Sequence, residues 1–98
     1  MTESLKKATE LLTEYSAEFK DEDGIAWVSV PVLHNIAVEL EYDDEAEDYL
    51  VHIRAWSPDH GLCSEELIYV TRDLDDAVRE VKERAAHLLK FDLDWFLS

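Results

Sequence analysis

Hydrophobic residues recur along the chain with two periods, a helical period near each end and an alternating one between. In residues 3–20 they return at steps of three and four, which predicts an amphipathic helix. Residues 73–90 show the same spacing, with Asp73 as the expected cap and two more aspartates in the first turn. Residues 91–98 fit a helix and a strand equally well, so periodicity leaves both alternatives open.

Four apolar runs between these helices predict strands, because three of them alternate and the fourth is short and apolar. The runs are residues 26–31, 36–42, 49–57 and 66–71. Pro31 cannot donate to a strand ladder, so we expect the first strand to end there and Pro31 to His34 to form a turn. The predicted fold is an α+β two-layer domain over residues 1–98, in which a helix, a four-stranded antiparallel meander and a second helix follow one another.

Alternation assigns the strand side chains to two sheet faces. The face expected to pack under the helices carries Val28, Val30, Ile36, Val38, Leu40, Tyr49, Val51, Ile53, Leu67 and Tyr69. The other face carries Trp27, Ala37, Glu39, Leu50, His52, Arg54, Trp56, Ile68 and Val70. That second face is too apolar for a purely solvated surface. We therefore expect it to be covered in part by the chain's own tail, with Phe91, Trp95 and Phe96, by a second copy or by a partner.

Composition places the chain among globular proteins but with an extreme charge. It has 98 residues, of which 47% are hydrophobic, and a formal net charge of -15 with only nine lysines and arginines. Such acidity argues against direct binding to nucleic acid or an anionic membrane, because phosphate contacts are made mainly by basic side chains. Cys63 is the only cysteine, and the N-terminal residues contain no apolar run typical of a secretory signal or a membrane span. These features predict a cytoplasmic protein whose electrostatic complement is a basic partner.

The charge is concentrated in one stretch. Residues 21–48 contain ten acids and no base, which accounts for two thirds of the net charge. In an antiparallel meander the start of the first strand lies beside the end of the second, so the acids before Gly24 and those after Leu40 should meet at one end of the sheet. The acidic candidates for partner binding are Asp21, Glu22, Asp23, Glu41, Asp43, Asp44, Glu45, Glu47 and Asp48.

These acids have two interpretations. Charged turns keep a small domain soluble and protect strand edges, which needs no partner. A merely solvated turn usually mixes signs, however, so a retained cluster of like charges favours a cationic partner. An EF-hand calcium site is excluded, because Val32 stands where the bidentate glutamate of that loop would fall. A looser carboxylate site for calcium stays an alternative.

Other chemistry has few candidates. "DHGLC" places His60 and Cys63 three residues apart in an expected loop, and the meander would bring His34 to the same end of the sheet. Three residues with one short spacing do not make the usual four-ligand zinc pattern. The sequence also lacks a glycine-rich phosphate loop and a Gly-x-Ser-x-Gly elbow. We therefore predict no catalytic residue, no metal and no cofactor.

In element order and acidity alone the chain resembles several groups of small bacterial and phage proteins: secretion chaperones, toxin-immunity proteins and acidic DNA mimics, including some anti-CRISPR proteins. No motif of these groups maps onto its residues, so no family is assigned. The leading hypothesis is a non-enzymatic binding module whose acids dock on and block a basic protein surface, such as a nucleic-acid channel, with Trp27 or Trp56 as a buried anchor. The alternatives are a small metal protein or enzyme using His34, His60 and Cys63, and a housekeeping homodimer with solvating acidic turns.

Overall fold

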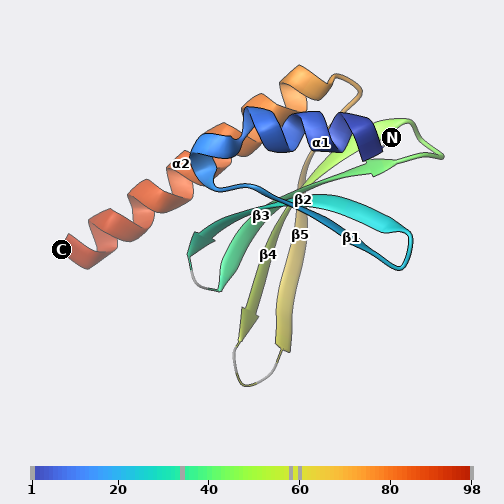
Figure 1. Cartoon of the computed structure of the whole chain (residues 1–98). Coiled ribbons are helices and arrows are strands. Elements are labelled where there is room, and N and C mark those ends of the chain that lie inside the picture. Colours follow the sequence, from blue (N-terminus) through green and yellow to red (C-terminus); the bar gives the residue numbers. More distant parts are fainter. Residues whose placement is uncertain (1, 34, 58, 60, 98) are drawn as a thin grey trace.

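The structure is a computed structural model that describes residues 2–33, 35–57, 59 and 61–97, with the backbone alone at 62, 63 and 90–97. Two helices and a short 3-10 turn flank five strands (Figure 1). In chain order the elements are α1 (Thr2–Leu11), η1 (Thr13–Tyr15), β1 (Glu18–Glu22), β2 (Ile25–Leu33), β3 (Ile36–Asp43), β4 (Asp48–Ser57), β5 (Gly61–Thr71) and α2 (Leu74–Leu97).

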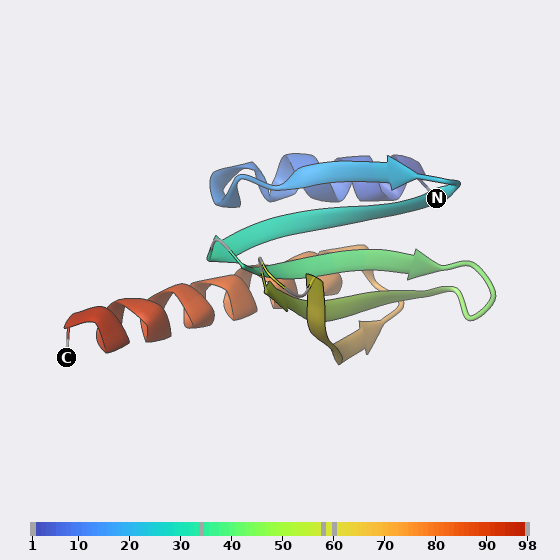
Figure 2. The same cartoon turned by 90° about the horizontal axis from the view of Figure 1, so that it is seen from below.

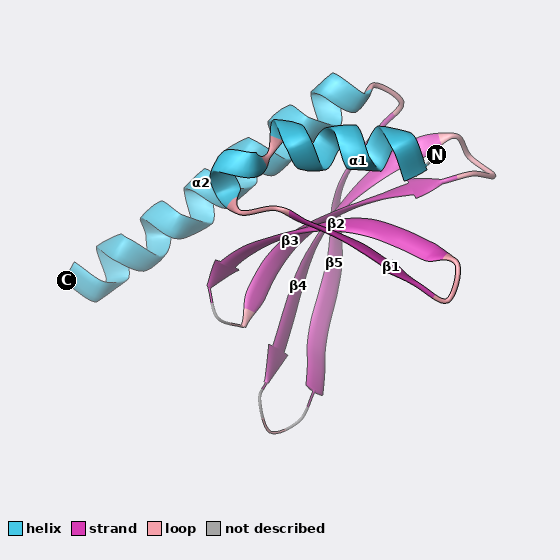
Figure 3. Cartoon of the chain, viewed as in Figure 1, coloured by secondary structure: helices cyan, strands magenta, loops and turns pink. Residues whose placement is uncertain are grey.

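The strands form one antiparallel sheet in the order β1-β2-β3-β4-β5, so every strand pairs with its neighbour in the sequence. Both helices lie on the same face of this sheet, and their arrangement is clearest when helices and strands are coloured separately (Figure 3). The α+β class with a helix at each end is thus confirmed. The predicted number of strands is wrong, because the sheet contains five strands and the sequence predicted four.

The extra strand comes from the segment predicted to be the second half of the first helix. The helix ends at Leu11, and Ser16 adopts a left-handed conformation with φ 60° that turns the chain back toward the sheet. Phe19 then pairs with Val28 and packs against the core. A single aromatic residue at position 19 satisfies a helical stripe and an alternating strand equally well. The helix prediction for residues 12–20 was therefore wrong.

A tight hairpin joins β1 to β2. Glu22 pairs directly with Ile25, which leaves Asp23 and Gly24 as a two-residue loop with φ 54° and 79°. Two positive φ values are the signature of a type I′ turn, whose twist matches that of antiparallel strands. Asp-Gly is the preferred sequence for this turn. The signal was present in the sequence, where it indicated a turn but not the strand before it.

The next connection also differs from the prediction. Pro31 remains in the ladder opposite Ala37, and β2 continues to Leu33 with a register shift between Pro31 and Leu33. An irregularity of this kind accommodates a residue without an amide hydrogen, so proline displaced the turn toward Asn35 without ending the strand at residue 31. His34 lies outside the described residues. The β2–β3 hairpin itself is retained.

Most of the predicted core is buried. Val28, Val30, Val38, Leu40, Tyr49 and Val51 are buried as expected, and Ile36, Ile53 and Tyr69 are partly buried. The prediction that Leu67 lies in the core is wrong, since half of its surface is exposed. A register shift opposite the Val51–His52 step places Tyr69 against Val51 but Leu67 against His52, which sends Leu67 to the opposite face.

Helix α2 begins as predicted and ends later. The Asp73 carboxylate accepts a 3.0 Å hydrogen bond from the Asp75 amide, which caps the helix. The helix then continues to Leu97, so residues 91–97 of the ambiguous tail are helical, and Figure 2 shows the C-terminal turns projecting past the sheet. The tail therefore does not cover the face opposite the helices, as one of the sequence expectations proposed. Within the described residues, neither helix combines the length and apolarity that crossing a membrane requires.

Candidate functional site: the acidic end and the open face

Two acidic turns lie at the same end of the sheet, as Figures 1 and 2 show. The β2–β3 register sets Trp27 opposite Glu41, so the β1–β2 turn and the β3–β4 turn are neighbours. Gly24 from the first turn and Asp44 from the second border one hollow of about 260 Å³. We call this region the acidic end. Its acids are Asp21, Glu22, Asp23, Asp43, Asp44, Glu45, Glu47 and Asp48.

The β3–β4 turn is held by local hydrogen bonds. The Asp43 carboxylate accepts bonds from the amides of Glu45 (3.0 Å) and Ala46 (3.3 Å). The Glu47 amide donates to the Asp43 carbonyl at 2.8 Å, and Glu47 has a φ of 59°. Asp43 therefore has a structural role in the turn. The side chains of Asp44, Glu45 and Glu47 are exposed and point their charge at solvent.

Few bases neutralise the acidic end. Arg72 lies 3.4 Å from Asp48, but no other acid of this end has an ion pair with a described basic residue. Tyr42 is partly buried, and its pKa is raised first by that burial and then by the negative charge of Glu47. Tyr42 also packs edge-on against Tyr49, with ring centroids 4.9 Å apart, beneath the turn.

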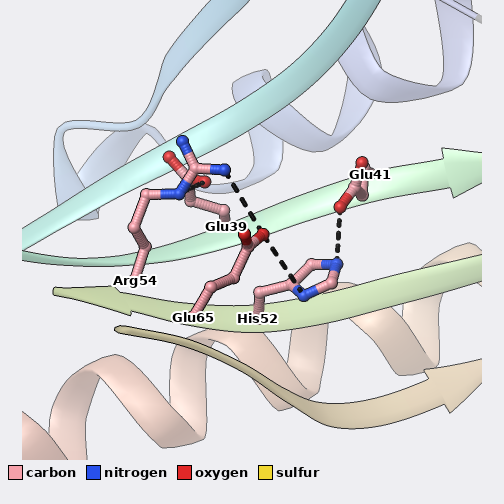
Figure 4. A network of polar contacts seen from close by, with 5 residues as sticks. All are labelled: Glu39, Glu41, His52, Arg54 and Glu65. Carbon is pink, nitrogen blue, oxygen red and sulfur yellow. Dashed lines mark hydrogen bonds and ion pairs between the residues drawn. The ribbon is translucent and has the colours of Figure 1, made fainter. Parts of the chain in front are cut away.

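The open face is the sheet face opposite the helices, and it carries a charge network across three strands (Figure 4). Arg54 Nε lies 3.2 Å from Glu39 Oε1, and Arg54 Nη2 lies 3.3 Å from Glu65 Oε1. His52 Nε2 is 2.5 Å from Glu41 Oε1, and His52 Nδ1 is 3.7 Å from the same Glu65 oxygen. One arginine and one histidine therefore stand between three carboxylates.

Glu39 is the buried member of this network, with only 7% of its surface exposed. Burial raises the pKa of Glu39, and the charge of Arg54 opposes that change. Glu65 raises the pKa further, while Ser29 and Trp27 lower it. The Trp27 Nε1–H is buried but is not aligned for a full hydrogen bond with a described residue. Arg54 is consequently the main group that opposes the rise in the pKa of Glu39.

Both tryptophans proposed as anchors lie on the open face and are half-buried. They border a hollow of about 370 Å³ that also contains Glu39 and Arg54. A second hollow, of about 270 Å³, joins Trp27 to the acidic end. Its lining residues are Glu22, Asp23, Ile25, Trp27, Glu39, Glu41 and Arg54. The structure therefore brings the acids of the first turn together with Trp27, whereas Trp56 lies further from them.

The alternative site falls largely outside the described residues. His34 and His60 lie outside the described residues, and only the backbone of Cys63 is described. That backbone belongs to β5, so Cys63 lies in a strand and not in the expected loop.

The sequence pattern predicted the correct sheet face for Glu39, His52 and Arg54 but not the contacts between them. Glu65 was not predicted to lie on this face, because β5 begins at Gly61, five residues before the start of the predicted strand.

No protein-family model matches this sequence, and no curated protein or solved structure is detectably similar to it.

Proposed function

We propose that this protein is a non-enzymatic binding module whose acidic end docks on a basic surface of another protein. The observation that carries this proposal is the convergence of two turns whose acids are mostly exposed and almost free of ion pairs. Like charges within a Debye length of about 8 Å repel one another. A fold that keeps these acids together is stabilised when a positively charged surface binds them and relieves their repulsion.

Short, hydrogen-bonded turns suit this role. The Asp-Gly hairpin and the Asp43-bonded turn hold their carboxylates on rigid loops, so little conformational freedom is lost on binding. Rows of fixed carboxylates can imitate phosphates, which favours a nucleic-acid-binding channel as the target surface. Trp27 borders the same hollow as Glu22 and Asp23 and would supply the apolar anchor, as tryptophan often does at interfaces.

The test compares three versions of the full chain as bait for a cell lysate eluted with a salt gradient. The turn variant carries Asp43→Asn, Asp44→Asn, Glu45→Gln and Glu47→Gln. The matched control carries Glu3→Gln, Glu10→Gln, Glu66→Gln and Glu83→Gln, which are exposed acids outside the acidic end. Removing four charges from -15 gives both variants a net charge of -11.

A basic protein captured by the native chain and the control, but lost by the turn variant, supports the proposal. With that protein purified, the turn variant should associate more slowly and with a flatter salt dependence, since long-range attraction acts mainly on the association rate. The turn variant should remain nearly as stable as the native chain, because Asp43→Asn keeps an oxygen acceptor for the turn amides and exposed repulsions are each worth only about a few tenths of a kcal/mol. Equal capture and equal salt slopes for both variants would refute a role for the acidic end.

A homodimer is the second candidate, favoured by apolar side chains on the open face. Leu67 and Val70 of the edge strand β5 are 50% and 46% exposed, and Ile25 is 59% exposed. An uncovered apolar face beside an unpaired edge is typical of surfaces that self-associate. Sedimentation equilibrium decides this candidate: a concentration-dependent dimer that Leu67→Ser abolishes would support it, and a monomer would exclude it.

A further inference from the structure

Three side chains with metal-binding atoms converge on the open face (Figure 4). Glu41 comes from β3, His52 from β4 and Glu65 from β5, and their nearest ligand atoms all lie within 4.8 Å of one another. Neighbouring strands of one sheet fix the positions of these residues. The side chains are 35%, 13% and 34% exposed, respectively, so the group is sheltered but reachable from solvent.

The contact between His52 and Glu41 is not a well-formed hydrogen bond. His52 Nε2 is buried and lies 2.5 Å from a Glu41 oxygen, yet no hydrogen bond to Nε2 is aligned among the described residues. In a neutral imidazole this nitrogen can offer a lone pair to a metal ion. The donor atoms of two ligands on one zinc ion lie further apart than His52 Nε2 and Glu41 Oε1 do here. Glu41 is more exposed than His52, so the Glu41 side chain would move outward to admit the ion.

The charges around this group leave a deficit of positive charge. Glu39, Glu41 and Glu65 contribute three negative charges, and Arg54 contributes one positive charge, which leaves -2 when His52 is neutral. A divalent cation would balance that sum. Arg54 and His52 both approach Oε1 of Glu65, so the arginine shares this carboxylate without neutralising the whole network.

We propose that Glu41, His52 and Glu65 form a binding site for one divalent metal ion of the zinc class. One histidine nitrogen with carboxylate oxygens is a donor set that suits zinc and neighbouring transition metals. Calcium and magnesium prefer sites built from oxygen alone, so they should bind more weakly. Three protein ligands also leave a coordination position open to solvent. This site uses none of the exposed turn acids and does not depend on a basic partner.

Titration of the full chain with zinc chloride, followed by calorimetry, tests the site. We expect one ion per chain, with His52→Asn weakening binding more than about tenfold, because even loss of an outer-shell partner typically costs about 10–100-fold. Glu41→Gln should also weaken binding and serves as a second variant if His52→Asn fails to fold. His87→Asn is the matched control, since His87 is exposed on α2 and lies outside the group.

Thermal unfolding gives an independent reading. Zinc should raise the melting temperature of the native chain and of His87→Asn but not that of His52→Asn, because an ion that binds only the folded state stabilises it. Absence of zinc binding in the native chain would overturn the proposal. It would also be overturned if His60→Asn with Cys63→Ser abolished binding while His52→Asn retained it, because that result would locate the ion elsewhere.

Discussion

Replacing Arg54 by methionine should destabilise the fold through Glu39. Methionine keeps much of the length of the arginine stem but removes the charge that faces Glu39 Oε1 at 3.2 Å. Glu39 is 7% exposed, so its carboxylate cannot recover that interaction by turning into water. Breaking a fully buried ion pair by removing one partner costs about 3–5 kcal/mol.

The expected loss is smaller than this limit, because 35% of the Arg54 side chain is exposed and solvent already screens part of the interaction. We expect a loss of about 2–3 kcal/mol in the free energy of unfolding. For a domain of this size that corresponds to a melting temperature lower by roughly 10–20 °C. Urea unfolding followed by circular dichroism measures the difference directly.

Glu39→Gln separates this mechanism from a simple loss of packing. The amide fills nearly the same volume without a buried charge, so this variant alone should remain within about 1 kcal/mol of the native chain. The double variant Glu39→Gln with Arg54→Met should be more stable than Arg54→Met by about 1–2 kcal/mol, because no uncompensated charge remains. If the two losses simply add, Glu39 is not the reason that Arg54 stabilises the fold.

The pH dependence has a definite sign. Burial raises the pKa of Glu39 in the folded state, so near that pKa the folded chain binds more protons than the unfolded chain. Stability from this group is therefore present at low pH and is lost as the pH rises through the folded pKa. Without Arg54 the pKa rises further, so the deficit of Arg54→Met relative to native should shrink as the pH falls from neutrality through the raised pKa of Glu39. A deficit that is constant over this range would contradict the mechanism.

Three further predictions concern the core, a helix contact and a turn. Val38→Ala and Val51→Ala should each cost about 1–3 kcal/mol in denaturant unfolding, because both side chains are fully buried, and values near zero would contradict the assigned strand faces. Tyr69→Phe should raise the pKa of Asp76, since the 2.7 Å bond from the Tyr69 hydroxyl is the largest cause of its lowered pKa, and carboxyl NMR titration would detect the change. The stabilisation that this bond gives should disappear as the pH falls through the folded pKa of Asp76. Gly24→Ala should cost about 1 kcal/mol, measured as a lower melting temperature, because the φ of 79° at this position strains any residue with a Cβ.

Local patterns in the sequence determined much of this architecture. Alternation in residues 36–42 assigned Val38 and Leu40 to the core, because a strand side chain's face depends only on its parity. Asp73 marked the start of α2, since capping involves only the next few residues. The concentration of acids in residues 21–48 was also visible directly, and antiparallel order was enough to predict that its two parts would meet.

Tertiary structure decided those conformations and contacts that local sequence patterns do not distinguish. Residues 18–20 fit the helical stripe, and they become part of a strand because Phe19 can pack on the sheet only after the chain reverses at Ser16. Leu67 changed faces because a register shift between β4 and β5 depends on the pairing of two strands, which neither strand encodes alone. The contacts of Glu65 with His52 and Arg54 depend on the same pairing. A site assembled from side chains on separate strands exists only once the register between those strands is set.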